Sequence, residues 1–364
     1  MAFPFVISFD GHAGLCEATD SRAIVIPRGF ADDDDHHLKK PTMPKAISTN
    51  DSNNLTTGFA VFGDRFNRVG SVDELVHDGD TITVKAAGDF GIRLLGIDTP
   101  EVSFSLPGAS FVKLTDDRWT NFLTDPFDSQ WGPMATLPPG LIAFLKTRIE
   151  PHVAKDHFAH AQRARIAFGN EIKADQKIMG SGDKFRFFLV FGFEVMDAYG
   201  RFLCLINRDQ PDRTKPTKRP NTYNLRLLEQ GLAFPYFIWP NINPWDKPDS
   251  MMDAVLKPGT AESLMTKKGE IELARNAVRN ARNKHLGLFD ATTPMLLEPF
   301  ELRMLSRRDT PARYLIDLTK NDDVLIHPKN YWTVPHSEDR LWIPGIYVPL
   351  FVEQGWKKQT SPTD

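Results

Sequence analysis

Residues 93–101 have the sequence Arg-Leu-Leu-Gly-Ile-Asp-Thr-Pro-Glu, and this stretch decides how the chain on either side is interpreted. Its first half is an apolar segment typical of a β-strand but contains an arginine, and two carboxylates follow where the strand ends. Ionised side chains are unfavourable in apolar surroundings unless they are paired or bind a ligand. We therefore expect a strand that leads directly into a functional site.

The residues at the end of this strand offer oxygen ligands. Pro100 biases Thr99 toward an extended conformation, which would place Asp98, the Thr99 carbonyl and Glu101 around one point. Asp80 follows an Asp-Gly pair that is by itself an ordinary hairpin turn, and it can approach the same point. Carboxylate and carbonyl oxygens suit a hard cation such as Ca²⁺. Histidine and cysteine are absent from this group of residues, which argues against zinc or copper.

A second arginine occurs in Tyr199-Gly200-Arg201, between two apolar segments. One interpretation is a β-turn with an exposed arginine. The other is that Arg201 and Arg93 hold one phosphate group from two sides. Guanidinium groups match the geometry of phosphate and neutralise the charge that develops on its oxygens during nucleophilic attack.

Four blocks of sequence occur in an order that is specific in combination, although each is weak alone. They are Asp-Gly-Asp-Thr at 78–81, the stretch 93–101, Tyr-Gly-Arg at 199–201 and Glu-Gln-Gly-Leu-Ala at 229–233. A later segment with alanines at 274, 277 and 281 and Leu-Gly-Leu-Phe at 286–289 continues the pattern. Over about residues 69–290 the chain resembles the staphylococcal (thermonuclease-like) nuclease family.

The resemblance implies an α+β fold, namely an OB-type five-stranded β-barrel with about three packed helices and extra flanking segments. It also implies a calcium-dependent nuclease that hydrolyses phosphodiester bonds of DNA or RNA and leaves 3′-phosphate ends. Glu101 would orient or deprotonate the attacking water, Arg93 and Arg201 would bind the phosphate, and Arg201 would stabilise the transition state. The remaining implied site residues are Asp80, Asp98 and the Thr99 carbonyl as ligands of Ca²⁺, with Tyr199 and Tyr236 near the substrate.

Hydrophobic patterning predicts how the elements and domains are organised. The expected strands cover residues 71–77, 81–87, 91–97, 185–195 and 201–206, and the expected helices cover 157–174, 223–233 and 261–285. We expect an N-terminal extension over 1–62, a nuclease-like OB-fold domain over 63–290 with an insertion at about 104–140, and a C-terminal extension over 291–364 that packs on the core.

The insertion is rich in aromatic residues, among them Trp119, Phe122 and Trp131. One hypothesis is that it partly covers the cleft and favours single-stranded over duplex substrates, because a duplex does not bend easily into a narrow groove. The other hypothesis is that these side chains pack against the C-terminal extension. This hypothesis is favoured, because large aromatic side chains are usually buried.

The charge distribution limits the class of partner. The chain of 364 residues has a formal net charge of −3, and its nuclease-like region is close to neutral, which counts against indiscriminate binding of polyanions. A loop with basic residues from Arg208 to Arg219 is a candidate surface for tracking a nucleic-acid strand. The basic residues of the last helix, Arg275, Arg279, Arg282 and Lys284, are expected to form its solvent face.

The expected partner is therefore DNA or RNA, with single strands favoured, and not a membrane. No secretory leader is evident and only two cysteines are present, so a cytoplasmic location is expected. Two alternatives remain open: a non-catalytic nucleic-acid or protein-binding scaffold of the same fold, and a phosphodiesterase that acts on small nucleotides. Catalysis is favoured over a scaffold because both arginines and all the expected carboxylates are present.

Overall fold

The computed structural model of the protein describes residues 46–50, 55–65, 68–75, 83–265 and 269–361. Two sheets meet at the segment 93–101. The first is three-stranded, in the order β11 (Phe187–Met196), β12 (Phe202–Arg208), β7 (Ile92–Leu94). The second is four-stranded, in the order β14 (Tyr314–Asp317), β16 (Arg340–Ile343), β13 (Phe234–Ile238), β8 (Gly96–Asp98).

The pairing within these sheets joins distant parts of the chain. Strand β12 runs antiparallel to β11 and parallel to β7, with Leu203 opposite Arg93. Strand β8 runs antiparallel to β13, with Asp98 opposite Phe234, and β13 runs parallel to β16 near the C-terminus. The strand that carries Asp98 therefore belongs to a sheet whose opposite side is built from residues beyond 313.

The chain crosses from the first sheet to the second between Leu94 and Gly96. The Leu95 amide still donates to the Cys204 carbonyl of the first sheet, at 3.0 Å. Gly96 then takes a φ of +73°, a left-handed conformation that glycine adopts without steric penalty. The bend at this glycine turns β8 away from β7, so that Arg93 and Asp98 lie in different sheets.

The remaining strands and the α-helices complete the framework of the described part of the chain. The other strands are β1 (Ile47–Asn50), β2 (Leu55–Gly58), β3 (Ala60–Phe62), β4 (Asp64–Arg65), β5 (Arg68–Val69), β6 (Val84–Ala86), β9 (Ser103–Leu106), β10 (Ala109–Lys113), β15 (Val324–Leu325) and β17 (Lys357–Lys358). The α-helices are α1 (Val72–Leu75), α2 (Asp117–Thr124), α3 (Pro139–Lys146), α4 (Val153–Met179), α5 (Tyr223–Glu229), α6 (Met251–Ala254), α7 (Glu270–Asn283), α8 (Pro299–Ser306) and α9 (Val348–Glu353).

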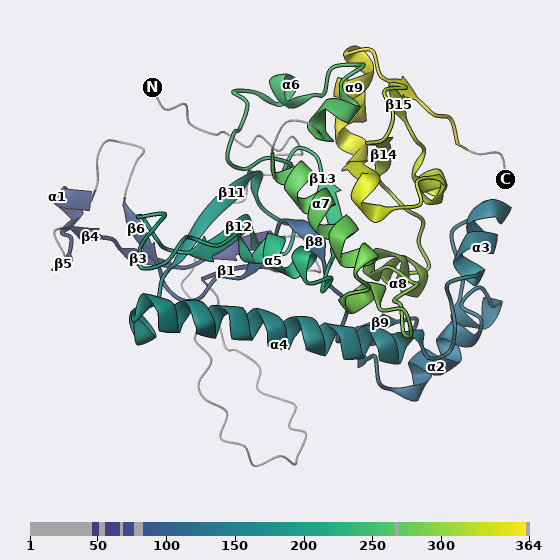
Figure 1. Cartoon of the computed structure of the whole chain (residues 1–364), viewed down its shortest axis with the longest axis horizontal. Coiled ribbons are helices and arrows are strands. Elements are labelled where there is room, and N and C mark those ends of the chain that lie inside the picture. Colours follow the sequence, from purple (N-terminus) through teal and green to yellow (C-terminus); the bar gives the residue numbers. More distant parts are fainter. Residues whose placement is uncertain (1–45, 51–54, 66–67, 76–82, 266–268, 362–364) are drawn as a thin grey trace, which may run out of the picture. The chain divides into compact units, whose positions relative to one another are not determined.

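The longest described helix, α4, contacts both α2 and α5, and α5 in turn contacts α7 (Figure 1). Helix α7 also contacts β13, next to the C-terminal elements drawn in yellow in Figure 1. Although α4 has 27 residues, neither it nor another helix in the described ranges is both long enough and apolar enough to cross a membrane.

Two large hydrophobic clusters form the core. The first joins Ile97 and helices α5 and α7 to C-terminal residues such as Phe351 and Trp356. The second joins Trp119 and Phe122 of the insertion to residues of α8 and to Trp342. The aromatic side chains of the insertion therefore pack against C-terminal residues, in agreement with the second of the two hypotheses for this segment.

The structure confirms the α+β class, and the helices expected at 157–174 and 223–233 are present as α4 and α5. The described strands form several separate sheets and no closed barrel. The prediction of a strand at 71–77 is wrong for the described residues of this segment, because residues 72–75 form α1. There the Ser71 amide and hydroxyl both donate to the Glu74 carboxylate, at 2.8 and 2.9 Å, a capping interaction that starts a helix.

His157 links α4 to the C-terminal segment and generates a prediction about pH. Its ring is fully buried, Nε2 lies 3.0 Å from the Leu297 carbonyl oxygen, and burial lowers its pKa to about 3. In the unfolded chain this histidine has an ordinary pKa near 6.5. Between pH 6.5 and 3 the unfolded state therefore binds more protons than the folded state, so the free energy of unfolding should fall as the pH falls through this range. His157→Gln should make the dependence of Tm on pH less steep between pH 4 and 6.5.

His152→Gln is the matched control, because this residue lies one turn earlier and its side chain is 61% exposed. Part of the slope should remain, since burial also lowers the pKa of His160 and His327. An unchanged slope in His157→Gln, with a native-like circular dichroism spectrum, would show that His157 is not a source of acid sensitivity.

Candidate active site

Four side chains form one ion-pair network, called here the Asp98 cluster: Arg93, Asp98, Glu101 and Arg303. Arg93 Nη2 donates to Asp98 Oδ1 at 2.8 Å. Arg303 Nη2 donates to Asp98 Oδ2 at 2.7 Å, and Arg303 Nη1 donates to Asp98 Oδ1 at 3.1 Å and to Glu101 Oε1 at 2.7 Å. The structure thus brings three of the expected site residues together, around an arginine that was not expected.

The carboxylate of Asp98 is the buried centre of this cluster, with its side chain only 2% exposed. Burial alone would raise the pKa of Asp98, but the positive charges of Arg303 and Arg93 outweigh burial and hold the pKa below its ordinary value. Asp98 is therefore a charged group at neutral pH. The same pairing raises the pKa of Arg303 against the effect of its own burial.

Arg303 is held in place by the construction of α8. The first turn has a capping box, in which Glu298 accepts from the backbone of Glu301 and Glu301 accepts from the Glu298 amide at 2.7 Å. Both glutamates are buried, and each has partners from elsewhere in the chain. Arg340 donates to Glu298 at 2.8 Å, and the Tyr331 hydroxyl donates to Glu301 at 2.7 Å.

Arg201 lies at the corner between β11 and β12, as expected, and Tyr199 lies beside it. The Arg201 guanidinium pairs with Asp197 at 2.7 Å and lies over the Tyr199 ring, 5.3 Å from its centroid. The side chains of Arg201 and Tyr199 are both substantially exposed. Arg201 is two residues before Leu203, which is opposite Arg93 in the paired strand, so the two arginines lie on one face of the sheet.

The expected calcium ligands do not form an open set of oxygen atoms in the described part of the chain. Both oxygens of Asp98 and one oxygen of Glu101 already accept hydrogen bonds from arginines. Thr99 is half-buried directly after Asp98, and Asp80 lies outside the described residues. Among the described residues, no group of three or more histidine, cysteine, aspartate or glutamate side chains could hold a metal ion. These donors therefore do not fit a calcium ion while Arg303 is bound to them.

Tyr236 is not an open surface for a nucleotide base. Its ring stacks on Phe300 at a centroid distance of 5.8 Å and contacts Trp342 at 5.6 Å. Its hydroxyl accepts a hydrogen bond from Arg313 at 2.9 Å. The ring and hydroxyl are thus used in packing against the C-terminal segment, which leaves Tyr199 as the exposed aromatic residue of the expected pair.

The two basic segments also differ from expectation. Arg208 is buried and donates to Asp175 of α4 at 2.9 Å, so it anchors its loop while residues 213–218 remain exposed. The expectation for the helix holds only in part: Lys284 is exposed and the Arg279 side chain is 37% exposed, but Arg275 and Arg282 turn toward acidic partners. Arg275 is fully buried against Asp339, and Arg282 pairs with the buried Glu338 at 2.5 Å.

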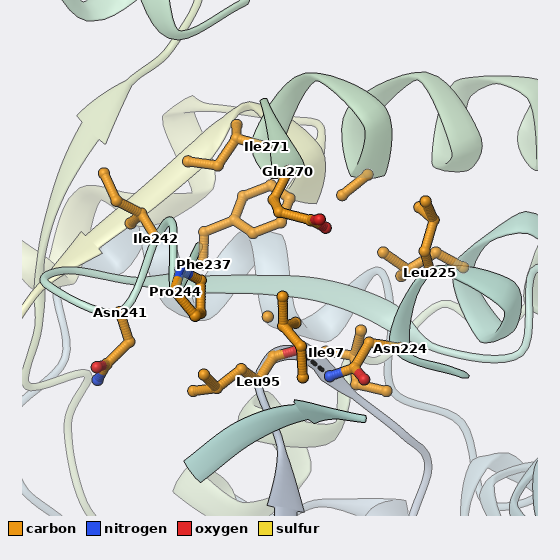
Figure 2. A pocket seen from close by; sticks show the side chains of 14 residues that line it. Leu95, Ile97, Asn224, Leu225, Phe237, Asn241, Ile242, Pro244, Glu270 and Ile271 are labelled. Carbon is orange, nitrogen blue, oxygen red and sulfur yellow. Dashed lines mark hydrogen bonds between the residues drawn. The ribbon is translucent and has the colours of Figure 1, made fainter. Parts of the chain in front are cut away.

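One pocket is lined by residues of β8 and β13 (Figure 2). Leu95, Ile97 and Phe237 line it together with α5 and α7, and Asn224 donates to the Leu95 carbonyl at 2.9 Å. Its volume is about 30 Å³, enough for a water molecule or two but not for a nucleotide. The pocket is therefore a feature of packing.

Arg303 is the site residue that the sequence analysis missed. It occurs in Leu-Arg-Met-Leu at 302–305, an arginine inside an apolar segment, which is the same signal that identified Arg93. What the sequence lacks is any sign of its partner, because Arg303 and Asp98 are 205 positions apart.

The cluster leads to a prediction about stability. Replacement of Arg303 by glutamine removes one of the two charges that compensate the buried Asp98. The free energy of unfolding should fall by about 3–5 kcal/mol, toward the lower end because Arg93 remains. Arg307→Gln, at the exposed end of the same helix, should change it by less than about 1 kcal/mol. Urea denaturation measures the free energy of unfolding of both variants. Equal losses in the two variants would show that the charge of Arg303 does not stabilise the fold by compensating Asp98.

No protein-family model matches the chain, and no curated protein matches it either. Its function is therefore inferred from the residues themselves. These residues are Arg93, Asp98, Glu101 and Arg303, with the exposed side chains of Arg201 and Tyr199 at the corner between β11 and β12.

Proposed function

We propose that this chain hydrolyses phosphodiester bonds of nucleic acid at the Asp98 cluster and Arg201. The observation that carries the proposal is the joining of Arg93 to Glu101 through Asp98 and Arg303. This places a guanidinium group and a carboxylate of the expected catalytic set in one network. Phosphodiester hydrolysis needs both kinds of group, one to neutralise the phosphate and one to act on water.

Each residue retains enough exposure for its proposed role. The Glu101 side chain is 25% exposed, and only its Oε1 atom is used by Arg303. An ionised carboxylate in this position can orient a water molecule or accept its proton. The Arg93 side chain is 33% exposed, so part of its guanidinium group can reach a phosphate oxygen. Arg201 supplies the second guanidinium group from the same face of the sheet.

The proposal includes a fold of OB type. Five described strands are candidates for the barrel: β3, β6, β7, β11 and β12. Three pairings among them are present, β3 with β6, β11 with β12, and β12 with β7. A closed barrel would require two further pairings, to join both edges of the β3–β6 pair to the two edges of the β11–β12–β7 sheet.

The proposed substrate is a single strand of DNA or RNA. Tyr199 is 53% exposed beside Arg201 and offers its ring to a nucleotide base. The exposed residues Arg213, Lys215 and Lys218 provide positive charge in the loop that follows β12. No step of the proposed hydrolysis depends on the implied Ca²⁺, because Arg303 occupies the carboxylates that would bind this ion.

That same observation favours a second candidate function, a non-catalytic binding protein of the same fold. An arginine on both carboxylates removes the oxygen atoms that a metal-dependent hydrolase needs, and a fold by itself does not establish activity. A scaffold should bind single-stranded nucleic acid without cleaving it, with or without added calcium. A phosphodiesterase that acts on small nucleotides is the remaining alternative, and a dinucleotide ester tests it in the same assay.

The test is turnover of single-stranded DNA, duplex DNA, RNA and a dinucleotide ester by the purified full chain. Glu101→Gln and Arg201→Ala should each lower turnover by about a hundredfold or more, the scale of losing a positioned base or a transition-state donor. Arg118→Ala is the control, because Arg118 also forms an exposed pair with a nearby aspartate, Asp116, but at the start of α2. Turnover like that of the wild type in a folded Glu101→Gln protein would rule out this active site.

A further inference from the structure

Arg303 lies where a cation between Asp98 and Glu101 would have to lie. Its two terminal nitrogens contact both oxygens of Asp98 and the nearer oxygen of Glu101 within 3.1 Å. These carboxylates follow one another along β8 and the segment after it, while Arg303 comes from α8. The guanidinium group therefore fills the space between the two acids instead of pairing with one acid from the side.

We infer that Arg303 closes this site to divalent cations, and that removal of its side chain opens a calcium site. Oxygen ligands from Asp98, Glu101 and the adjoining backbone, completed by water, are the kind that Ca²⁺ accepts. Arg303 denies these oxygens to an ion both by binding them and by repelling a second positive charge.

Arg303 is not free to swing away, because α8 is fixed at several points. Leu302 and Leu305, on either side of it in the helix, are completely buried in the second hydrophobic cluster. The Ser306 hydroxyl donates to the Ser105 carbonyl of β9, four residues after Glu101. With the buried capping box at its start, the helix is anchored at both ends. An ion would have to break this packing in order to displace the guanidinium group.

The charges of the cluster are already balanced. Arg93 and Arg303 carry two positive charges, and Asp98 and Glu101 carry two negative charges. Replacement of Arg303 by a neutral side chain leaves the cluster with one negative charge in excess. An excess of negative charge among partly buried oxygens is what attracts a hard cation.

The inference rests on the proposed function only in that both concern the Asp98 cluster. Calcium binding can be measured without a substrate, and it tests the inference directly. Isothermal titration calorimetry with CaCl₂ is carried out on the full chain and on Arg303→Gln, Arg303→Lys and Arg307→Gln. Glutamine keeps a hydrogen-bond donor near the acids and removes the charge, while lysine keeps the charge. The wild type, Arg303→Lys and Arg307→Gln should show no calcium binding, and Arg303→Gln should bind one Ca²⁺ with a Kd of about 10⁻⁴ to 10⁻³ M.

Two measurements keep the result interpretable if Arg303→Gln folds poorly. Calcium should raise the Tm of Arg303→Gln but leave that of the wild type unchanged, because a ligand stabilises only the state that binds it. The added substitution Glu101→Gln should abolish this rise. Binding of Ca²⁺ by the wild type, lost in Glu101→Gln, would overturn the inference. Failure of a folded Arg303→Gln protein to bind Ca²⁺ would also overturn it, since no cation site would then lie beneath the arginine.

The outcome is separate from that of the proposed function. A chain that cleaves no substrate would disprove hydrolysis, yet its calcium titrations would still decide the role of Arg303. A chain that cleaves nucleic acid at the same rate with and without a calcium chelator would agree with both. Activity that requires Ca²⁺ in the wild type would support hydrolysis and contradict the closed site.

Discussion

The carboxylate of Asp98 is buried and charged, and much of the surrounding structure follows from the need to compensate it. An uncompensated charge in the interior is too unfavourable to persist, so its partners have to be supplied by the fold. One partner, Arg93, lies across the bend at Gly96 in the neighbouring sheet. The other, Arg303, requires α8 to lie against the segment that follows β8.

This requirement makes the C-terminal residues part of the site and of the core. Strands β16 and β14 complete the sheet that begins with β8, and Trp342 belongs to the same cluster as the side chains of the insertion. Further buried ion pairs join α7 to residues 338 and 339. Such pairs contribute little net stability, but removal of one partner is strongly destabilising.

The sequence predicted those features that depend on neighbours along the chain. Arg93, Asp98 and Glu101 lie within nine positions of one another, so their proximity follows from the sequence alone. Helices α4 and α5 followed from periodicity for the same reason. At residues 71–77 apolar alternation was misleading, because the capping interaction between Ser71 and Glu74 outweighed it over so short a segment.

Features that depend on distant partners could not be predicted. The arginines of α7 were expected to face solvent, since nothing in that helix indicates that Glu338 and Asp339 will pack against it. Tyr236 was assigned to substrate by its position, but Phe300 and Trp342 cover its ring. Arg303 belongs to the same class, because only the folded chain shows that it meets Asp98.

A cation that is part of the chain differs in one respect from a cation taken from solution. The effective concentration of the Arg303 guanidinium group beside Asp98 is set by the packing of α8 and is independent of dilution, as for any tethered ligand. Dialysis or a change in the ionic composition of the medium leaves it in place. Occupancy at Asp98 thus follows the folding of residues 299–306, and the supply of ions outside the protein has no part in it.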